Sequence, residues 1–235
     1  MTPVVGTLVA KPYTEVDARI DLHDSQDRHG ALIQDFSRLF YQAPHTWGIT
    51  LYRGVPVMKA PTDLWMYHEC IHALKPSLIV ETGTAYGGSA AFFADQIDTA
   101  GGGRVISVDI EGQPNLPTRK NLTYWHGASS VAPSVLACLR EAAVGQRVMV
   151  VLDSNHHTDH VVDELDAYAP LVSVGQLLVV EDTNISDPAF MGKPIAGPGQ
   201  ALAEWLPLHH EFVRETLCER FLLTFSPGGW LMRVA

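Results

Sequence analysis

A regular alternation of short apolar runs with helix-like segments begins at residue 77 and constrains the fold more than any other feature of the sequence. Apolar and polar residues do not alternate within these runs, so we expect strands that are covered on both faces. Strands of this kind that alternate with helices predict an α/β fold with a doubly wound, mostly parallel sheet. The runs cover residues 77–82, 104–109, 122–127, 147–153 and 176–182.

The first part of the chain departs from this alternation. Residues 24–43 have the spacing of an amphipathic helix, and two short strands are expected around Arg53-Gly54. A further helix is expected over 61–76. We therefore expect residues 1–60 to form an N-terminal accessory segment that acts as a lid or makes oligomer contacts.

The C-terminal part of the chain also departs from the alternation. The segment "FLLTFSPGGWLMRVA" (221–235) predicts two strands around Pro227-Gly228-Gly229, and hence an antiparallel hairpin at the end of a parallel sheet. The main domain is expected to cover residues 61–235.

Composition limits the partners of the protein. With 16 Lys and Arg against 26 Asp and Glu, the chain carries a net charge of −10, which repels nucleic-acid backbones. No basic region precedes an apolar stretch at the N-terminus, and no apolar run approaches the roughly 20 residues that span a bilayer. We expect a cytoplasmic protein that acts on a small molecule and binds neither nucleic acid nor membrane.

Polar residues stand at the end of each predicted strand. The carboxyl ends of parallel strands meet at one edge of the sheet, where ligands bind in folds of this type. Five polar strand ends therefore predict one site. These ends are Glu81, Asp109, Gly127 followed by Ala128-Ser129, Asp153, and the pair Glu181-Asp182.

The segment "ETGTAYGGS" (81–89) predicts a loop that binds an adenosine-containing cofactor. Gly83, Gly87 and Gly88 permit a tight turn with close backbone approach, and Ser89 can begin a helix whose amides face a ligand. Asp109 ends the next strand, about 20 residues further on, where an acid binds ribose hydroxyls.

The position of Glu81 decides between two cofactors. Its carboxylate would repel the pyrophosphate of NAD but tolerates a sulfonium or ammonium group, and a GxGxxG sequence is absent. S-adenosylmethionine is therefore favoured over NAD. The expected cofactor-binding residues are Glu81, Gly83, Thr84, Gly87, Gly88, Ser89, Asp109, Ser129 and Asp153.

Acidic residues at two strand ends that we expect to be adjacent predict a metal site. Asp153, Glu181 and Asp182 would repel one another unless a cation lay among them, and no Lys or Arg stands near the Glu181-Asp182 pair in the sequence. Oxygen ligands suit Mg²⁺. Helix capping alone would explain Asp153, but it does not explain the consecutive pair.

Three histidines follow Asp153 within seven residues. Two histidines with a carboxylate can bind Fe(II), but His156, His157 and His160 lie too close in sequence for several to face one ion. A neutral imidazole beside a metal site can serve as a general base near pH 7. His156 is the expected base, His157 is a weaker candidate, and His160 is expected to pack or cap.

Several segments together resemble the cephalosporin hydroxylase / rhamnosyl O-methyltransferase family. The likeness covers about 180 residues, from Trp47 to the end. It implies the class I methyltransferase, Rossmann-like fold and a domain that uses S-adenosylmethionine. The segments that carry it include "KPSLIVETGTAYGGSA", "VISVDI", "VLDSNHHTDHVVDEL", "GQLLVVEDTN" and "FLLTFSPGGWLMRV".

The resemblance also implies residue roles. By similarity to macrolide-sugar O-methyltransferases, Asp153, Glu181 and Asp182 would hold Mg²⁺ and His156 would be the base. The expected reaction is Mg²⁺-dependent methyl transfer to a hydroxyl of a natural-product sugar or a catechol-like phenol, carried out by a homo-oligomer. The alternatives are an Fe(II)/2-oxoglutarate hydroxylase, an NAD-dependent oxidoreductase and a non-catalytic partner.

Overall fold

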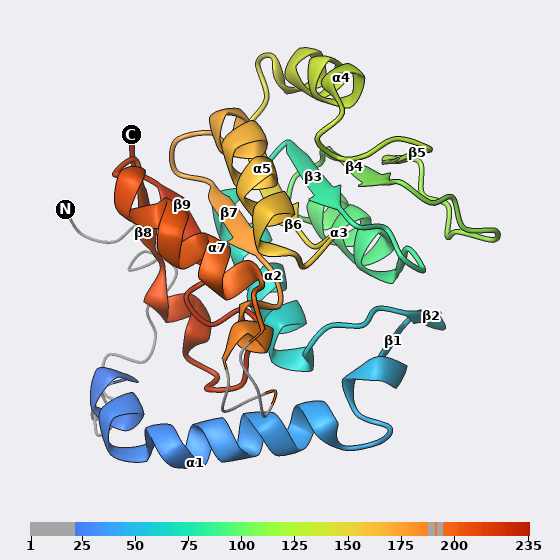
Figure 1. Cartoon of the computed structure of the whole chain (residues 1–235). Coiled ribbons are helices and arrows are strands. Elements are labelled where there is room, and N and C mark those ends of the chain that lie inside the picture. Colours follow the sequence, from blue (N-terminus) through green and yellow to red (C-terminus); the bar gives the residue numbers. More distant parts are fainter. Residues whose placement is uncertain (1–21, 188–190, 192–194) are drawn as a thin grey trace.

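A seven-stranded sheet forms the centre of the protein in the computed structural model, which describes residues 22–187, 191 and 195–235. The strand order is β5-β4-β3-β6-β7-β9-β8, with β3 to β7 parallel to one another and β9 antiparallel to both of its neighbours, β7 and β8 (Figure 1). The predicted doubly wound, mostly parallel sheet is confirmed. Its strands are β3 (Leu78–Thr82), β4 (Arg104–Asp109), β5 (Leu122–His126), β6 (Val148–Leu152), β7 (Leu177–Val180), β8 (Phe212–Arg214) and β9 (Trp230–Arg233).

Helices cover both faces of the sheet. One face packs against α4, α5 and α7, and the opposite face packs against α2 and α3. In the accessory segment, α1 is followed by a two-stranded hairpin of β1 and β2, which confirms the helix and the turn expected there. The helices and the hairpin are α1 (Leu22–Gln42), β1 (Leu51–Tyr52), β2 (Val55–Pro56), α2 (Pro61–Leu74), α3 (Gly88–Thr99), α4 (Pro133–Ala143), α5 (Thr158–Tyr168) and α7 (Pro198–Trp205).

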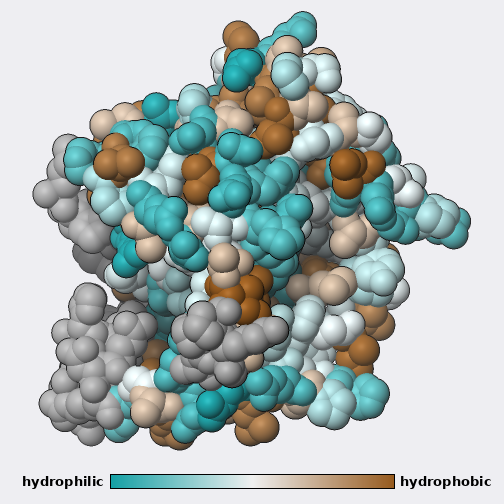
Figure 2. Space-filling view, viewed as in Figure 1, coloured by the Kyte–Doolittle hydropathy of each residue, from teal (hydrophilic) through white to brown (hydrophobic). Residues whose placement is uncertain are grey.

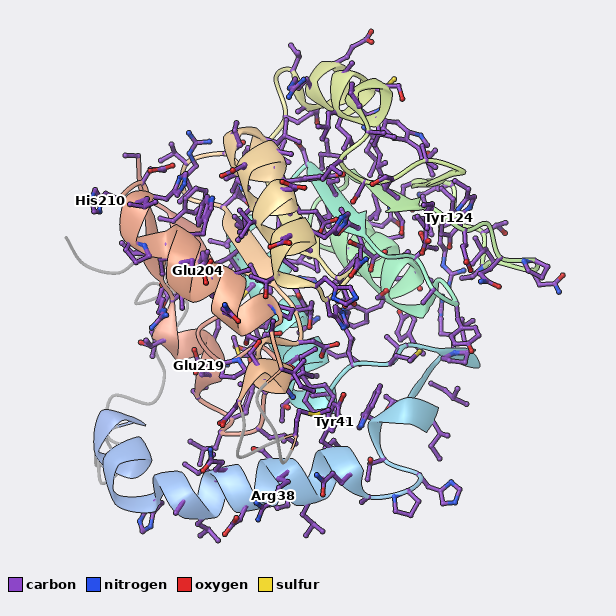
Figure 3. The ribbon with its side chains drawn as sticks, viewed as in Figure 1. Arg38, Tyr41, Tyr124, Glu204, His210 and Glu219 are labelled. Carbon is purple, nitrogen blue, oxygen red and sulfur yellow. The ribbon has the colours of Figure 1, made fainter. Side chains whose placement is uncertain are left out.

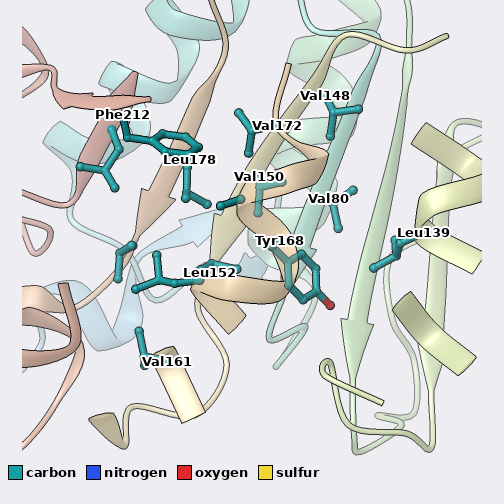
Figure 4. Packing of buried hydrophobic residues seen from close by; sticks show 14 of the residues in the cluster. Val80, Leu139, Val148, Val150, Leu152, Val161, Tyr168, Val172, Leu178 and Phe212 are labelled. Carbon is teal, nitrogen blue, oxygen red and sulfur yellow. The ribbon is translucent and has the colours of Figure 1, made fainter. Parts of the chain in front are cut away.

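Two hydrophobic cores explain why the strands are apolar throughout. Successive residues of a strand point to opposite faces, so Val150 joins the core under α4, α5 and α7, whereas Met149 joins the core under α2 and α3. Figure 4 shows the first core, in which Tyr168 and Leu178 pack with the strand valines. Each such buried apolar side chain contributes about 1.5–3 kcal/mol.

The C-terminal part of the chain forms an antiparallel strand pair as predicted, but the first of its two strands lies earlier in the chain than predicted. Only the second of the two strands expected around residues 227–229 forms, as β9, and it pairs with β8 from earlier in the chain. Residues 221–225 form a loop instead, because Phe225 is buried against Tyr41 and Trp47 of the accessory segment. Within this run Leu223 and Phe225 are buried whereas Phe221 and Leu222 are exposed, but a short apolar run in a loop has the same sequence appearance as a buried strand.

The surface is mixed in character. Hydrophilic and hydrophobic side chains are interspersed on the face shown in Figure 2. Within the described ranges, no helix combines the length and the apolar character that crossing a bilayer requires. The first 21 residues of the expected accessory segment lie outside the described residues.

Candidate active site

Two adjoining cavities lie at the carboxyl edge of the parallel strands, as the polar strand ends predict. The first cavity has a volume of about 390 Å³ and the second about 280 Å³. The walls of both include Gly83 and Ala85 from the loop after β3, and Asp153 and Ser154 from the loop after β6. Asp153 therefore stands at the boundary between them.

The loop after β3 is held against the loop after β6. Gly83 has a φ of 86°, and a β-carbon built on it would lie 1.8 Å from the backbone carbonyl oxygen of Asp153, so only glycine fits there. The amides of Thr84 and Ala85 donate to Oδ2 of Asp109 at 2.7 and 3.2 Å. Asp109 thus fixes the loop from the neighbouring strand and also lines the first cavity.

Most of the expected cofactor residues face the two cavities, but Glu81 and Gly87 do not. Glu81 is fully buried behind the loop, where it accepts a hydrogen bond from Ser107 Oγ at 2.6 Å, and burial raises its pKa to about 7. A β-carbon on Gly87 would meet Pro117 at 2.9 Å, away from both cavities. Gly83, Asp109, Ser129 and Asp153 line the first cavity, and Gly83, Thr84, Gly88, Ser89 and Asp153 line the second.

Asp153, His156 and Asp182 converge at the second cavity. Nε2 of His156 lies 3.5 Å from Oδ1 of Asp153 and 3.5 Å from Oδ2 of Asp182. This nitrogen is buried and has no hydrogen-bond partner in the described structure. One side-chain atom each of Asp153, His156 and Asp182 lies within 4.8 Å of the other two, which is a spacing that a metal ion can bridge.

Glu181, the third predicted metal ligand, does not join this group. It faces Lys59, whose Nζ lies 3.0 Å from Oε1 of Glu181 and 2.8 Å from Oδ2 of Asp153. The sequence shows no cation near Glu181-Asp182, but the fold brings one from the accessory segment. Lys59 was missed because it is a single lysine in the apolar stretch "VPVMKAP", with no pattern that marks it.

The charged groups of this cluster shift the pKa values of their neighbours. Burial opposes a charge on Lys59, but the carboxylates of Asp153 and Glu181 outweigh that cost and raise its pKa. Burial and the charge of Asp153 raise the pKa of Asp182 to about 7. Burial acts to lower the pKa of His156, yet the adjacent Asp153 and Asp182 raise it. A divalent cation placed here would favour the ionised form of Asp182.

The other two histidines lie apart from this group. His157 precedes α5 and lines neither cavity. His160 lines the first cavity and contacts its neighbours there, with Nε2 at 3.2 Å from Ser154 Oγ and 3.3 Å from Ser130 Oγ.

Aromatic residues of the accessory segment complete the second cavity. The rings of Tyr41 and Trp47 stack with centroids 5.1 Å apart, and both line the cavity with His156 and Asp182. Tyr41 lies on the side of α1 that faces the rest of the protein (Figure 3). The chain thus provides one cavity walled by the β3 loop and a second cavity walled partly by the accessory segment.

Sequence comparisons give relatives over most of the chain. The model of the family described as Rhamnosyl O-methyltransferase/CmcI matches residues 45–234. The rhamnosyl O-methyltransferase of Mycobacterium leprae is 31% identical over 203 residues, which cover 83% of this chain and 87% of that protein. The protein of the same name from Mycobacterium tuberculosis strain H37Rv is 32% identical over 219 residues, covering 86% and 85%.

Structure comparisons support the fold. The apo structure of the N160 form of CmcI matches with a TM-score of 0.62 and 21% identity, covering 84% of this chain and 83% of that chain. The D160 form of CmcI with Mg and SAM also has a TM-score of 0.62, at 20% identity. The expected resemblance is confirmed, and the chain belongs to the Rhamnosyl O-methyltransferase/CmcI family.

Proposed function

We propose that the protein transfers a methyl group from S-adenosylmethionine to a hydroxyl of a small molecule with the help of Mg²⁺, and that a sugar hydroxyl is the favoured acceptor. The observation that carries the proposal is the convergence of Asp153, His156 and Asp182 at the boundary of two cavities. The names of the mycobacterial relatives and the CmcI structure with Mg and SAM support the acceptor class and the cofactors.

The first cavity suits the cofactor. It has room for a nucleoside-sized group, and Gly83 allows the backbone of the loop to approach such a group closely. Asp109 keeps its place at the end of β4, where a carboxylate can accept bonds from ribose hydroxyls, and Ser129 supplies a further hydroxyl. S-adenosylmethionine supplies an electrophilic methyl group on sulfur.

The group of ligand atoms at the second cavity suits a divalent cation. Oδ1 of Asp153 and Oδ2 of Asp182 face the same point, and the buried ammonium of Lys59 pairs with Asp153 and Glu181 but not with Asp182. Mg²⁺ prefers oxygen ligands, so the two aspartates would hold it. A bound Mg²⁺ supplies a positive charge that lowers the pKa of a hydroxyl on the acceptor.

His156 is the proposed general base. A hard cation leaves its Nε2 free, and this nitrogen lies beside both proposed metal ligands. His156 would therefore take the proton from the acceptor hydroxyl at Nε2, while the oxygen bonds to the methyl carbon and the bond from that carbon to sulfur breaks, which leaves S-adenosylhomocysteine. Tyr41 and Trp47 would hold the acceptor in place, which agrees with a covering role for the accessory segment.

A homo-oligomer is also proposed. Leu32, Phe36 and Leu39 follow one another at helical spacing on α1 and are 68%, 52% and 66% exposed. An apolar stripe of this kind on a helix is typical of a contact surface.

Calorimetry tests the proposed cofactors. The protein is titrated with S-adenosylmethionine, NAD and 2-oxoglutarate, each with and without Mg²⁺. Of the three ligands, only S-adenosylmethionine is expected to bind. Binding of 2-oxoglutarate or of NAD in its place would contradict the proposal. Methyl transfer to simple rhamnosides and catechols then tests the acceptor class.

A further inference from the structure

Two histidines of α2 stand in a sequence pattern that the proposed function does not use. Residues 68–72 read "HECIH", so His68 and His72 are four positions apart, and a glutamate directly follows the first of them. Side chains at this spacing lie on the same side of a helix, one turn apart. In zinc peptidases, two histidines with this spacing on a helix bind one metal ion.

The structure brings the two imidazole rings together beside α3. Their centroids are 4.5 Å apart, and both side chains are half-buried. Neither histidine lines either of the two cavities at the edge of the sheet. The pair is therefore separate from the cluster of Asp153, His156 and Asp182.

Residues of α3 hold one nitrogen of each ring. Nδ1 of His68 lies 2.6 Å from Oε1 of Gln96, and Nε2 of His72 lies 3.4 Å from Oγ1 of Thr99. An amide oxygen only accepts, so Nδ1 of His68 carries the proton and its Nε2 presents a lone pair. The Thr99 hydroxyl donates to backbone carbonyl oxygens of α3 at 3.0 and 3.1 Å. Its oxygen therefore accepts from Nε2 of His72, and Nδ1 of His72 presents a second lone pair.

This arrangement is the one that metal-binding histidines usually have. A ligating imidazole donates its other N–H to a protein acceptor, which fixes the tautomer and the orientation of the ring. Gln96 and Thr99 supply such acceptors here. Among the residues that the structure describes, no hydrogen bond occupies Nε2 of His68 or Nδ1 of His72.

The glutamate of the pattern is committed elsewhere. Glu69 forms an ion pair with Arg220, which comes from the C-terminal part of the chain. In zinc peptidases the corresponding glutamate is the general base beside the metal ion. Because Glu69 is neutralised by Arg220, the pattern in this chain provides ion binding without a base for hydrolysis.

We propose that His68 and His72 form a binding site for a transition-metal ion of the zinc class, on the side of α2 that lies next to α3. Imidazole nitrogens suit Zn²⁺, Ni²⁺ and Cu²⁺, whereas Mg²⁺ prefers oxygen ligands. Water completes the coordination of an ion that has two protein ligands. An ion that binds only the folded pair also stabilises the protein against unfolding.

Quenching of tryptophan fluorescence by Cu²⁺ tests the site, because the ring centroid of Trp65 lies 5.0 Å from that of His68. The full chain is titrated with Cu²⁺ in the presence of excess Mg²⁺, and Zn²⁺ is then added as a competitor. Cu²⁺ is expected to quench the emission of Trp65, and Zn²⁺, which does not quench, is expected to restore it. Trp65→Phe should lose this part of the quenching, while calorimetry shows an unchanged affinity for Cu²⁺.

Variants of the two histidines decide whether they act as a pair. His68→Gln and His72→Gln are each expected to weaken Cu²⁺ and Zn²⁺ binding at least about tenfold, because loss of a ligand costs no less than loss of a group that only orients one. His157→Gln is the matched control and should keep the affinity of the original protein. Circular dichroism of each variant establishes that its helices are retained.

Each possible result has a clear meaning. Weaker binding in both His68→Gln and His72→Gln supports the pair. Weaker binding in only one of them means a single histidine ligand and overturns the inference, as does quenching that persists in both or that Trp65→Phe leaves at full size. If Asp182→Asn removes the binding instead, the ion belongs to the acidic cluster and the inference is also overturned.

Discussion

The backbone carbonyl oxygen of Asp153 lies only 1.8 Å from the position that a β-carbon on Gly83 would take. The loop after β3 and the loop after β6 are therefore in direct backbone contact at Gly83. This contact brings the proposed cofactor loop beside the proposed metal ligand, so a change at Gly83 acts on both.

Gly83→Ala is expected to destabilise the protein by at least about 1–3 kcal/mol, from the strained φ of 86° and the clash together. It is also expected to weaken binding of S-adenosylmethionine, because the two loops must separate. Thermal unfolding and calorimetry measure the two effects. Gly48→Ala is the control, since no atom beyond its chain neighbours lies within 4 Å of its β-carbon position and both values should be retained.

His156→Ala is expected to lower kcat by about 10²–10⁴, the usual contribution of a general base, while the affinity for S-adenosylmethionine stays near normal. A methyl-transfer assay and cofactor titration measure the two quantities. His157→Ala is the matched control, because His157 lines neither cavity and should retain turnover. Full activity of the His156 variant would reject His156 as the base.

Removal of divalent ions with a chelator is expected to abolish turnover, and added Mg²⁺ should restore it, because Asp153 and Asp182 hold the ion beside the base. Asp182→Asn should need more Mg²⁺ for half-maximal activity. Activity in the presence of excess chelator would contradict the metal-dependent mechanism.

Trp47→Ala is expected to raise the KM for the acceptor with little change in cofactor affinity. Trp47 stacks on Tyr41 and lines the second cavity but not the first. Steady-state kinetics with a varied acceptor measure the effect. Trp65 is 56% exposed and lines neither of the two cavities, so Trp65→Ala should leave KM unchanged.

Phe36→Glu is expected to lower the mass of the particle in solution, since it places a charge in the centre of the apolar stripe of α1. Light scattering during size-exclusion chromatography measures the mass. Val144→Glu is the control for a new surface charge, because Val144 is 76% exposed and lies in a different part of the fold. Equal masses for all three proteins would mean that this stripe is not the contact.

Local sequence patterns were sufficient to predict the sheet and its polar edge. The runs that end in Asp109 and Asp153 are strands whose carboxyl ends meet at one site, as predicted. This succeeded because burial on both faces requires strands without polar alternation, and parallel pairing places all their ends together.

Contacts between distant segments decided the rest. Lys59 stands 94 positions before Asp153, and no local pattern indicates that its ammonium meets the acids at the strand ends. The same holds for Phe225, which packs against Tyr41 of α1 and lies in a loop where a strand was predicted. The sequence determined which residues reach the edge of the sheet. Only the tertiary structure decided which charges pair there, because the cost of burying a charge depends on the partners that the completed fold brings to it.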